Sequence, residues 1–175
     1  MPTESRRFGL TWLSEAWHAG GTGGLNWHLH AHQSRHRWLA TAQALAAYLD
    51  GIHPQRRHLL LIGASAGWMM PPAFLRRFDR IDAYDIDPLA GLWFRARHAK
   101  HLRAHGVALH YHRHDAIAHL PALLAQHPQA CLWFDNLLGQ LRYRFGDTDA
   151  AQDRLRQLHH DLRGHPWGSV HDAYS

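Results

Sequence analysis

The chain contains one cysteine and one lysine among its 175 residues, and it has no long apolar run. Cys131 alone cannot form an internal disulfide and fits a reducing compartment, so we expect a cytoplasmic protein. With Lys100 as the one lysine, the chain has neither the Gly-Lys-Ser/Thr of a phosphate-binding P-loop nor the Tyr-x-x-x-Lys pair of many nicotinamide oxidoreductases. No apolar run approaches about 18 residues and the first ten lack a secretory signal pattern, so no membrane span is predicted.

The composition is that of one globular domain, with 46% hydrophobic and 19% charged residues. The net charge is +5, carried by 19 − 1 = 18 arginines and the single lysine. A basic chain can bind nucleic acid or another anion. The arginines are scattered in ones and twos rather than gathered in a stripe, so nucleic acid is an alternative partner that the pattern does not favour.

The most informative stretch runs from residue 58 to residue 87. The apolar run Leu59–Ile62 predicts a buried parallel strand, and the small residues of Gly63–Gly67 predict a turn. A helix from Pro71 to Phe78, a second strand at residues 81–84 and then Asp85 follow. The spacing of 85 − 63 = 22 positions is close to the roughly 20 found in nucleotide-binding crossovers, in which the acid binds the ribose. The alternative is an ordinary crossover followed by a surface acid.

The dinucleotide fingerprint G-x-G-x-x-G is broken here by Ser65 and Trp68. The segments LLLIGASAG and YDIDP instead resemble the glycine loop and the acidic second-strand loop of class I S-adenosylmethionine-dependent methyltransferases. Ser65 and Leu61 stand where that family commonly has a further glycine and an acid. The resemblance implies that Asp85 binds the ribose and that Ile86 packs on the adenine. It also implies that the methionine end of the cofactor is lined by Gly63, Ala64, Ser65 and Gly67.

Two further strands are predicted at residues 107–112 and 130–134. By the same resemblance, Asp115 and Ala116 after the third strand contact the adenine. Asp135 and Asn136 follow the fourth strand, and ligands of open parallel sheets bind beyond such strand ends. We therefore expect both at the reactive centre, with Asp135 acting as a base or orienting group. A plain helix cap is the competing interpretation.

Residues 1–57 are predicted to form an N-terminal helical arm, and residues 58–175 a Rossmann-like cofactor-binding domain, within one structural unit. Residues 1–33 read as irregular, with His28, His30 and His32 on one face of an extended segment, while residues 34–49 read as a helix. His110, His112 and His114 share one face of the third strand. No metal is predicted at either set, because no cysteine or acid completes the first and a helix is expected to cover the second.

The alternation of strands and helices predicts an α/β fold with a doubly wound, mostly parallel sheet of about five strands. In the helix from Pro88 to about Ala104, Leu92 and Trp93 are expected to face the sheet. The fifth strand, Trp167–Val170, is expected at an open edge, so the chain is a fragment or a short form and could dimerise there. The implied function is methyl transfer from S-adenosylmethionine to an unknown acceptor. The alternative is a non-catalytic nucleotide-fold binding module, or a fragment that lacks a complete substrate site.

Overall fold

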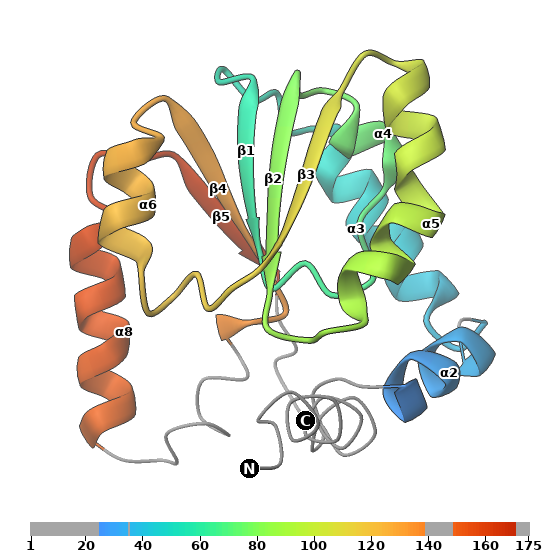
Figure 1. Cartoon of the computed structure of the whole chain (residues 1–175), viewed down its shortest axis with the longest axis horizontal. Coiled ribbons are helices and arrows are strands. Elements are labelled where there is room, and N and C mark those ends of the chain that lie inside the picture. The colour runs from blue at the N-terminus through green and yellow to red at the C-terminus, as the bar shows by residue number, and fades with distance from the viewer. Residues whose placement is uncertain (1–24, 35, 139–148, 171–175) are drawn as a thin grey trace, which may run out of the picture.

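Five parallel strands form one sheet in the order β3-β2-β1-β4-β5 (Figure 1). The computed structural model describes residues 25–34, 36–138 and 149–170. The strands are β1 (His58–Ile62), β2 (Arg80–Asp85), β3 (Ala108–Arg113), β4 (Ala130–Asp135) and β5 (Trp167–Val170). The strand order reverses between β1 and β4, as in Rossmann-like folds. The predicted α/β fold with a five-stranded parallel sheet is confirmed.

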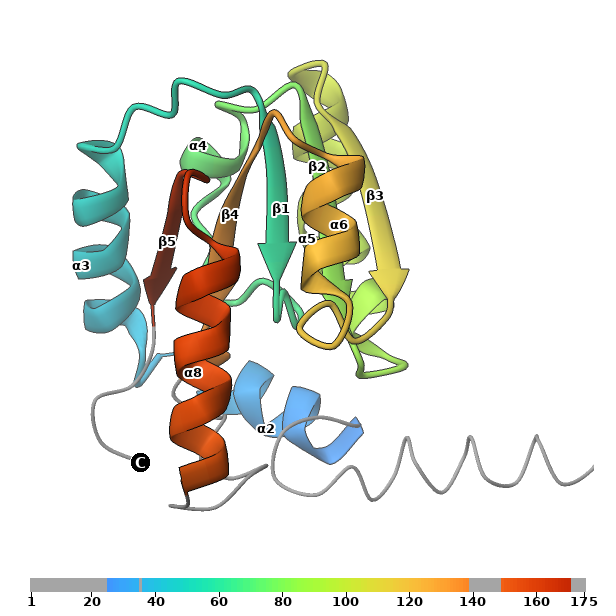
Figure 2. The same cartoon turned by 90° about the vertical axis from the view of Figure 1, so that its left-hand side faces the viewer.

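Helices lie on both faces of the sheet (Figure 1). One face is covered by α3 (Leu39–Asp50), α4 (Pro72–Leu75) and α5 (Ala90–Ala104). The other face is covered by α6 (Leu120–Gln126) and α8 (Asp149–Asp161). All strands run in the same direction, so their carboxyl ends meet at one edge of the sheet, where α2 (Leu25–Ser34) also lies (Figure 2).

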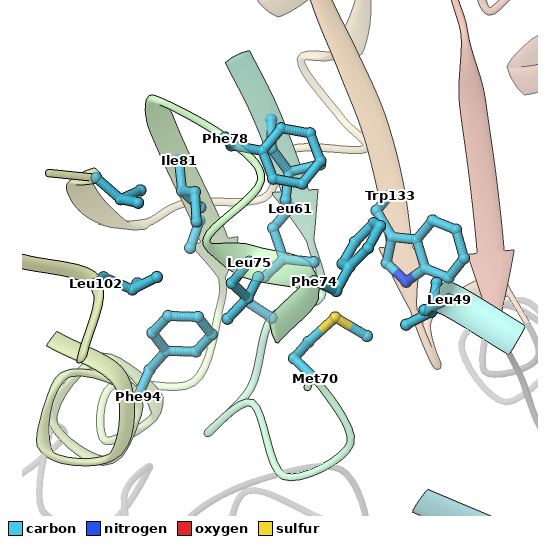
Figure 3. Packing of buried hydrophobic residues seen from close by; sticks show 14 of the residues in the cluster. Leu49, Leu61, Met70, Phe74, Leu75, Phe78, Ile81, Phe94, Leu102 and Trp133 are labelled. Atoms are coloured by element: carbon cyan, nitrogen blue, oxygen red, sulfur yellow. The ribbon is translucent and has the colours of Figure 1, made fainter. Parts of the chain in front are cut away.

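The first face carries the larger apolar cluster. Phe74 of α4 packs against Trp133 of β4, with ring centroids 5.6 Å apart, and against Phe78, with centroids 5.4 Å apart (Figure 3). Leu49 and Leu75 are completely buried in the same cluster. At about 25 cal/mol for each Å² of apolar surface removed from water, these large side chains are the main stabilising contribution to the fold.

The second face is apolar over β1 and β4, and the cluster under α6 and α8 also includes Tyr84 of β2. Towards β3 this face is polar, because Asp82 and His112 alternate with the residues that face the first core. The expectation that a helix covers the third-strand histidines is wrong. His110, His112 and His114 are exposed, since the apolar cluster under α6 includes no residue of β3.

The N-terminal arm differs from the sequence prediction in one respect. Residues 25–33 were expected to be irregular, with three histidines on one face of an extended segment, but residues Leu25–Ser34 form α2. His30 therefore points away from His28 and His32, because successive helical residues turn by about 100°. His28 is fully buried, whereas His30 and His32 are exposed. Residues 1–24, including the glycine-rich stretch, lie outside the described residues.

The predicted inner face of α5 is also wrong. Leu92 is 66% exposed and Trp93 only partly buried, while Phe94, His98 and Leu102 are completely buried. The buried set recurs every four residues and includes a histidine. The prediction counted His98 as polar and Leu92 as apolar, and it therefore placed the buried face of α5 on the wrong side of the helix.

Strand β5 is at one edge of the sheet, since within the described part of the chain it pairs only with β4. The predicted edge position is confirmed. Among the described helices, none is both long and apolar enough to cross a membrane.

Candidate functional site

The strand ends at the carboxyl edge bring most of the predicted site residues together. Ile62 pairs with both Tyr84 and Phe134, so the segments that follow β1, β2 and β4 begin side by side. The Ser65 amide N–H donates to Oδ2 of Asp85 over 2.8 Å. A crevice at the carboxyl edge, next to the reversal of strand order, is where open α/β sheets bind ligands.

Gly63 is required by both its backbone angle and its surroundings. Its φ is +73°, a region that side chains strain. A Cβ atom there would lie 2.9 Å from the carbonyl oxygen of Asp135 and 2.9 Å from Cβ of Leu137. The loop after β1 therefore runs directly against the segment after β4, as the site prediction requires.

Gly67 has a different role from the one predicted for it. Its φ is +64°, and a Cβ atom there would lie 2.7 Å from Nε2 of His98 and 2.8 Å from Cε2 of Phe94. The missing side chain lets α5 pack on the loop, and His98 Nε2 lies 3.0 Å from the Gly67 carbonyl oxygen. Burial lowers the pKa of His98 to about 4, so this imidazole is neutral at pH 7.

The other loop residues offer a ligand mainly their backbone. Ala64 is completely buried in the first core. Ser65 has a φ of +45°, and its carbonyl oxygen accepts a 2.9 Å hydrogen bond from the Tyr111 hydroxyl. The helix expected from Pro71 to Phe78 is the four-residue α4, which starts 72 − 63 = 9 positions after Gly63. No described helix begins directly at the loop, so the expected helix N-terminus beside the nucleotide is absent from the described residues.

Asp85 ends β2 and organises the loop. Its Oδ2 accepts from the Ser65 amide and its Oδ1 from the Asp87 amide, each over 2.8 Å. Burial raises its pKa, and these two hydrogen bonds work against that rise. A carboxylate has about four acceptor positions, so two remain for a ligand.

Asp87 holds α2 against the strand ends, which the sequence did not indicate. Its side chain is buried, Oδ2 lies 3.0 Å from Nε2 of His28, and Oδ1 accepts from the Leu89 amide over 2.8 Å. The His28 ring also stacks on Trp93, with centroids 6.0 Å apart. A buried acid next to a buried histidine could have been suspected only if residues 25–34 had been predicted as helix.

The remaining predicted cofactor contacts flank this centre. Ile86 is 57% exposed, an unusual state for a large apolar side chain at a strand tip. Asp115 caps the turn after β3, where its Oδ1 accepts from the Ala118 amide over 3.1 Å. Ala116 is 3% exposed and packs in the second core. Ile86 and Asp115 are thus accessible to a ligand, and Ala116 offers little surface.

Asp135 is the most unusual group at the edge. It is 8% exposed, and no described residue forms a hydrogen bond with its carboxylate. Burial, and to a lesser degree the charge of Asp85, raise its pKa to about 7. Asn136 follows with a φ of +51°, and its amide donates to the Val170 carbonyl over 2.7 Å.

Three carboxyl groups therefore face one small region. Asp85, Asp87 and Asp135 all raise the pKa of the Tyr111 hydroxyl, although burial is the larger cause. Among the described residues, no arginine or lysine side chain is hydrogen-bonded to any of the three. Nor does any described group of three or more His, Cys, Asp or Glu side chains have an arrangement that could hold a metal ion. The carboxyl ends of the strands thus bring three acidic side chains close together, and the pKa of one of them, Asp135, is raised to about 7 by burial and by the charge of Asp85.

Comparisons with protein-family models, with curated proteins and with solved structures gave no match.

Proposed function

We propose that the carboxyl edge of the sheet binds S-adenosylmethionine and that the protein transfers its methyl group to an acceptor of unknown identity. The observation that carries the proposal is the Asp135 carboxyl. It is buried, has no hydrogen bond from the described residues, and titrates near pH 7 beside Asp85. Buried groups with such perturbed pKa values in a ligand crevice are typical of catalytic sites.

The carboxyl groups at the strand ends favour this cofactor over phosphate-bearing nucleotides. A dinucleotide or nucleoside triphosphate would bring anionic phosphates to Asp85 and Asp135, and no described helix begins directly at the loop to offset the repulsion. S-adenosylmethionine carries a cationic sulfonium in place of phosphates. The three carboxyl groups would attract that charge.

The chain has groups suited to each part of the cofactor. The two free acceptor positions of Asp85 can bind the ribose hydroxyls, and exposed Ile86 can pack on the adenine. Asp115 and Ala116 follow β3, and β3 is separated by β2 from β1 and its glycine loop. The backbone of Gly63, Ser65 and their neighbours can approach the methionine end closely.

Bound S-adenosylmethionine supplies a methyl group already activated by its cationic sulfur, so the protein's contribution is mostly positioning and removal of a proton. Asp135, with a pKa near 7, is a suitable base for the acceptor. In this step the proton of the attacking O, N or S atom is transferred to the Asp135 carboxylate. Asn136 lies next to it and is assigned to orienting the acceptor. With its single cysteine in reduced form, the chain is suited to the cytoplasm.

A non-catalytic binding module is the second candidate function, because the contacts of Asp85 and α2 already engage groups at the strand ends. Both oxygens of Asp85 already accept backbone hydrogen bonds, and α2 is fixed at the strand ends by His28. A module of this kind would use the edge for packing or weak binding rather than for chemistry.

Isothermal titration calorimetry with S-adenosylhomocysteine and with NAD tests the proposal. We expect binding of the first and none of the second. Ile86→Ser removes an exposed apolar side chain, so it should not affect the fold. It should weaken binding about tenfold, which corresponds to the free energy of burying roughly one apolar side chain against the ligand. Leu92→Ser is the matched control, because Leu92 is also exposed but lies on α5. Equal effects of the two substitutions, or tighter binding of NAD, would exclude the proposed cofactor site.

Asp85→Ala should weaken binding about 10- to 100-fold, since hydrogen bonds to a charged acceptor contribute about 1.5–3 kcal/mol. Asp87→Ala is not a suitable control, because the contacts of Asp87 with His28 and with the Leu89 amide make that substitution a structural change. Exposed Asp79 is the better control. If S-adenosylhomocysteine binds but Asp135→Asn methylates its acceptor as fast as the wild type, the second candidate or another base is favoured.

A further inference from the structure

A second pocket, away from the three carboxyl groups, lies on the second face of the sheet. It has a volume of about 550 Å³ and is bounded by β2, β3 and α6. Figure 2 looks onto this face and shows α6 in front of β2, with β3 beside it. We call it the basic pocket, because its charged lining consists of Arg80, Arg113, four histidines and a single acid, Asp82.

Asp82 fixes the donors of this pocket in place. It is 1% exposed, and its Oδ2 accepts from Nε of Arg80 and lies 2.7 Å from Nε2 of His58. Its Oδ1 lies 2.9 Å from Nε2 of His112 and 3.3 Å from Nη2 of Arg80. Despite burial, the hydrogen bonds from Arg80 and the two histidines hold the pKa of Asp82 well below its usual value. The acid is thus fully ionised and fully engaged.

The lining has a net positive formal charge, because it contains two arginines, Arg80 and Arg113, and one acid, Asp82. The imidazoles of His112, His114, His119 and His127 complete its polar lining. His114 stacks on His119, with ring centroids 4.5 Å apart. No hydrogen bond from the described residues uses Nη1 of Arg80 or Nδ1 of His112. Nitrogen atoms of two arginines and four histidines therefore line the pocket, and they come from two strands and a helix.

We propose that the basic pocket binds a phosphate-bearing small molecule, with the phosphate held by Arg113, Arg80 and the imidazoles of β3 and α6. A tetrahedral oxyanion presents acceptors in several directions, which suits donors that come from two strands and a helix. A metal ion is disfavoured, since no suitable ligand group exists among the described residues. Nucleic acid is disfavoured because the one aromatic residue of the lining other than histidine, Tyr84, is 5% exposed and stacks on His112, so it offers no platform for bases.

The test uses inorganic pyrophosphate in calorimetry at about pH 6 and low salt. We expect binding, weakened at least about tenfold in the double variant Arg113→Gln/His114→Gln. The matched control, Arg103→Gln/His105→Gln, removes the same residue types from an exposed part of the chain at the end of α5 and should leave the affinity unchanged. No heat of binding at millimolar pyrophosphate, or equal weakening in both double variants, would overturn the proposal. The proposal would also be overturned if a single-stranded oligonucleotide bound more tightly per phosphate than pyrophosphate and were not displaced by it.

Neither pyrophosphate nor the oligonucleotide involves S-adenosylhomocysteine, so the result is independent of the methyltransferase proposal.

Discussion

Asp135→Asn should make the protein more stable at alkaline pH. The unfolded chain releases the proton of this carboxyl near pH 3.9, whereas the folded protein keeps it up to about pH 7. The folded state thus binds more protons than the unfolded state between these values, and stability falls as the pH rises through this window. A shift of about 3 pKa units corresponds to about 4 kcal/mol lost above pH 7.

The magnitude that matters is a difference between two pH values. At about pH 5 roughly a third of the loss has occurred, and at about pH 8 all of it, so the wild type should lose about 3 kcal/mol from this group between them. The amide that the substitution introduces does not titrate, and any cost of its unmade hydrogen bonds is the same at both pH values. The stability difference between variant and wild type should therefore shift by about 3 kcal/mol in favour of the variant.

Urea denaturation of both proteins at the two pH values measures this shift. Asp153→Asn is the control, because Asp153 is exposed and pairs only with exposed Arg156 on α8, so its effect should stay within about 1 kcal/mol at either pH. A difference between Asp135→Asn and wild type that is the same at both pH values would refute the reasoning. Asp135 would then be solvated or paired in solution. If Asp135→Asn shows this gain in stability and also loses methyl transfer, Asp135 is a residue that supports activity at a cost in stability.

Three other outcomes follow from the same contacts. Gly67→Ala should destabilise the fold by about 1–3 kcal/mol more than Gly106→Ala in urea denaturation, because both glycines have positive φ but only Gly67 faces buried atoms within 3 Å. His98 is neutral when folded, so stability should fall by about 2 kcal/mol from pH 7 to pH 5, and His98→Gln should abolish that part of the acid sensitivity. Gly168→Ala should be at least as damaging as Gly67→Ala in thermal unfolding, since its Cβ would lie 2.5 Å from Cζ3 of Trp133; a neutral effect would place the Trp133 ring elsewhere.

The strands could be predicted from the sequence because their signals are local. The run Leu59–Ile62 is apolar throughout, as expected for a strand buried on both faces, and Gly63 marks its end. The spacing from Gly63 to Asp85 correctly placed the two at one edge, joined through the Ser65 amide. Once the order of the strands along the chain is known, the rules for connecting parallel strands leave few possible sheet topologies.

The packing partners of the edge could not be predicted, because they depend on residues far apart in the chain. His28 and Asp87 are 59 positions apart and meet only after α2 forms. Gly67 looks like a ligand-binding glycine by sequence, but its space is filled by Phe94 and His98 of α5. That contact was hidden because the buried face of α5 includes a histidine, which a hydrophobic pattern counts as polar.

The polar face of β2 shows how one strand serves two regions of opposite charge. In Arg-Ile-Asp-Ala-Tyr-Asp, alternate residues point to opposite faces, so Ile81 and Ala83 enter the first core while Asp82 and Tyr84 face the basic pocket. Asp85 then lies at the tip, beyond the last core residue, where its charge raises the pKa of Asp135. The alternation predicts a strand with one solvated face. The pocket forms where α6 borders this polar face, because the cluster under α6 includes Tyr84 of β2 but no residue of β3. Burying polar groups without hydrogen-bond partners is costly, which is a physical reason for β3 to lie beyond the second layer of helices.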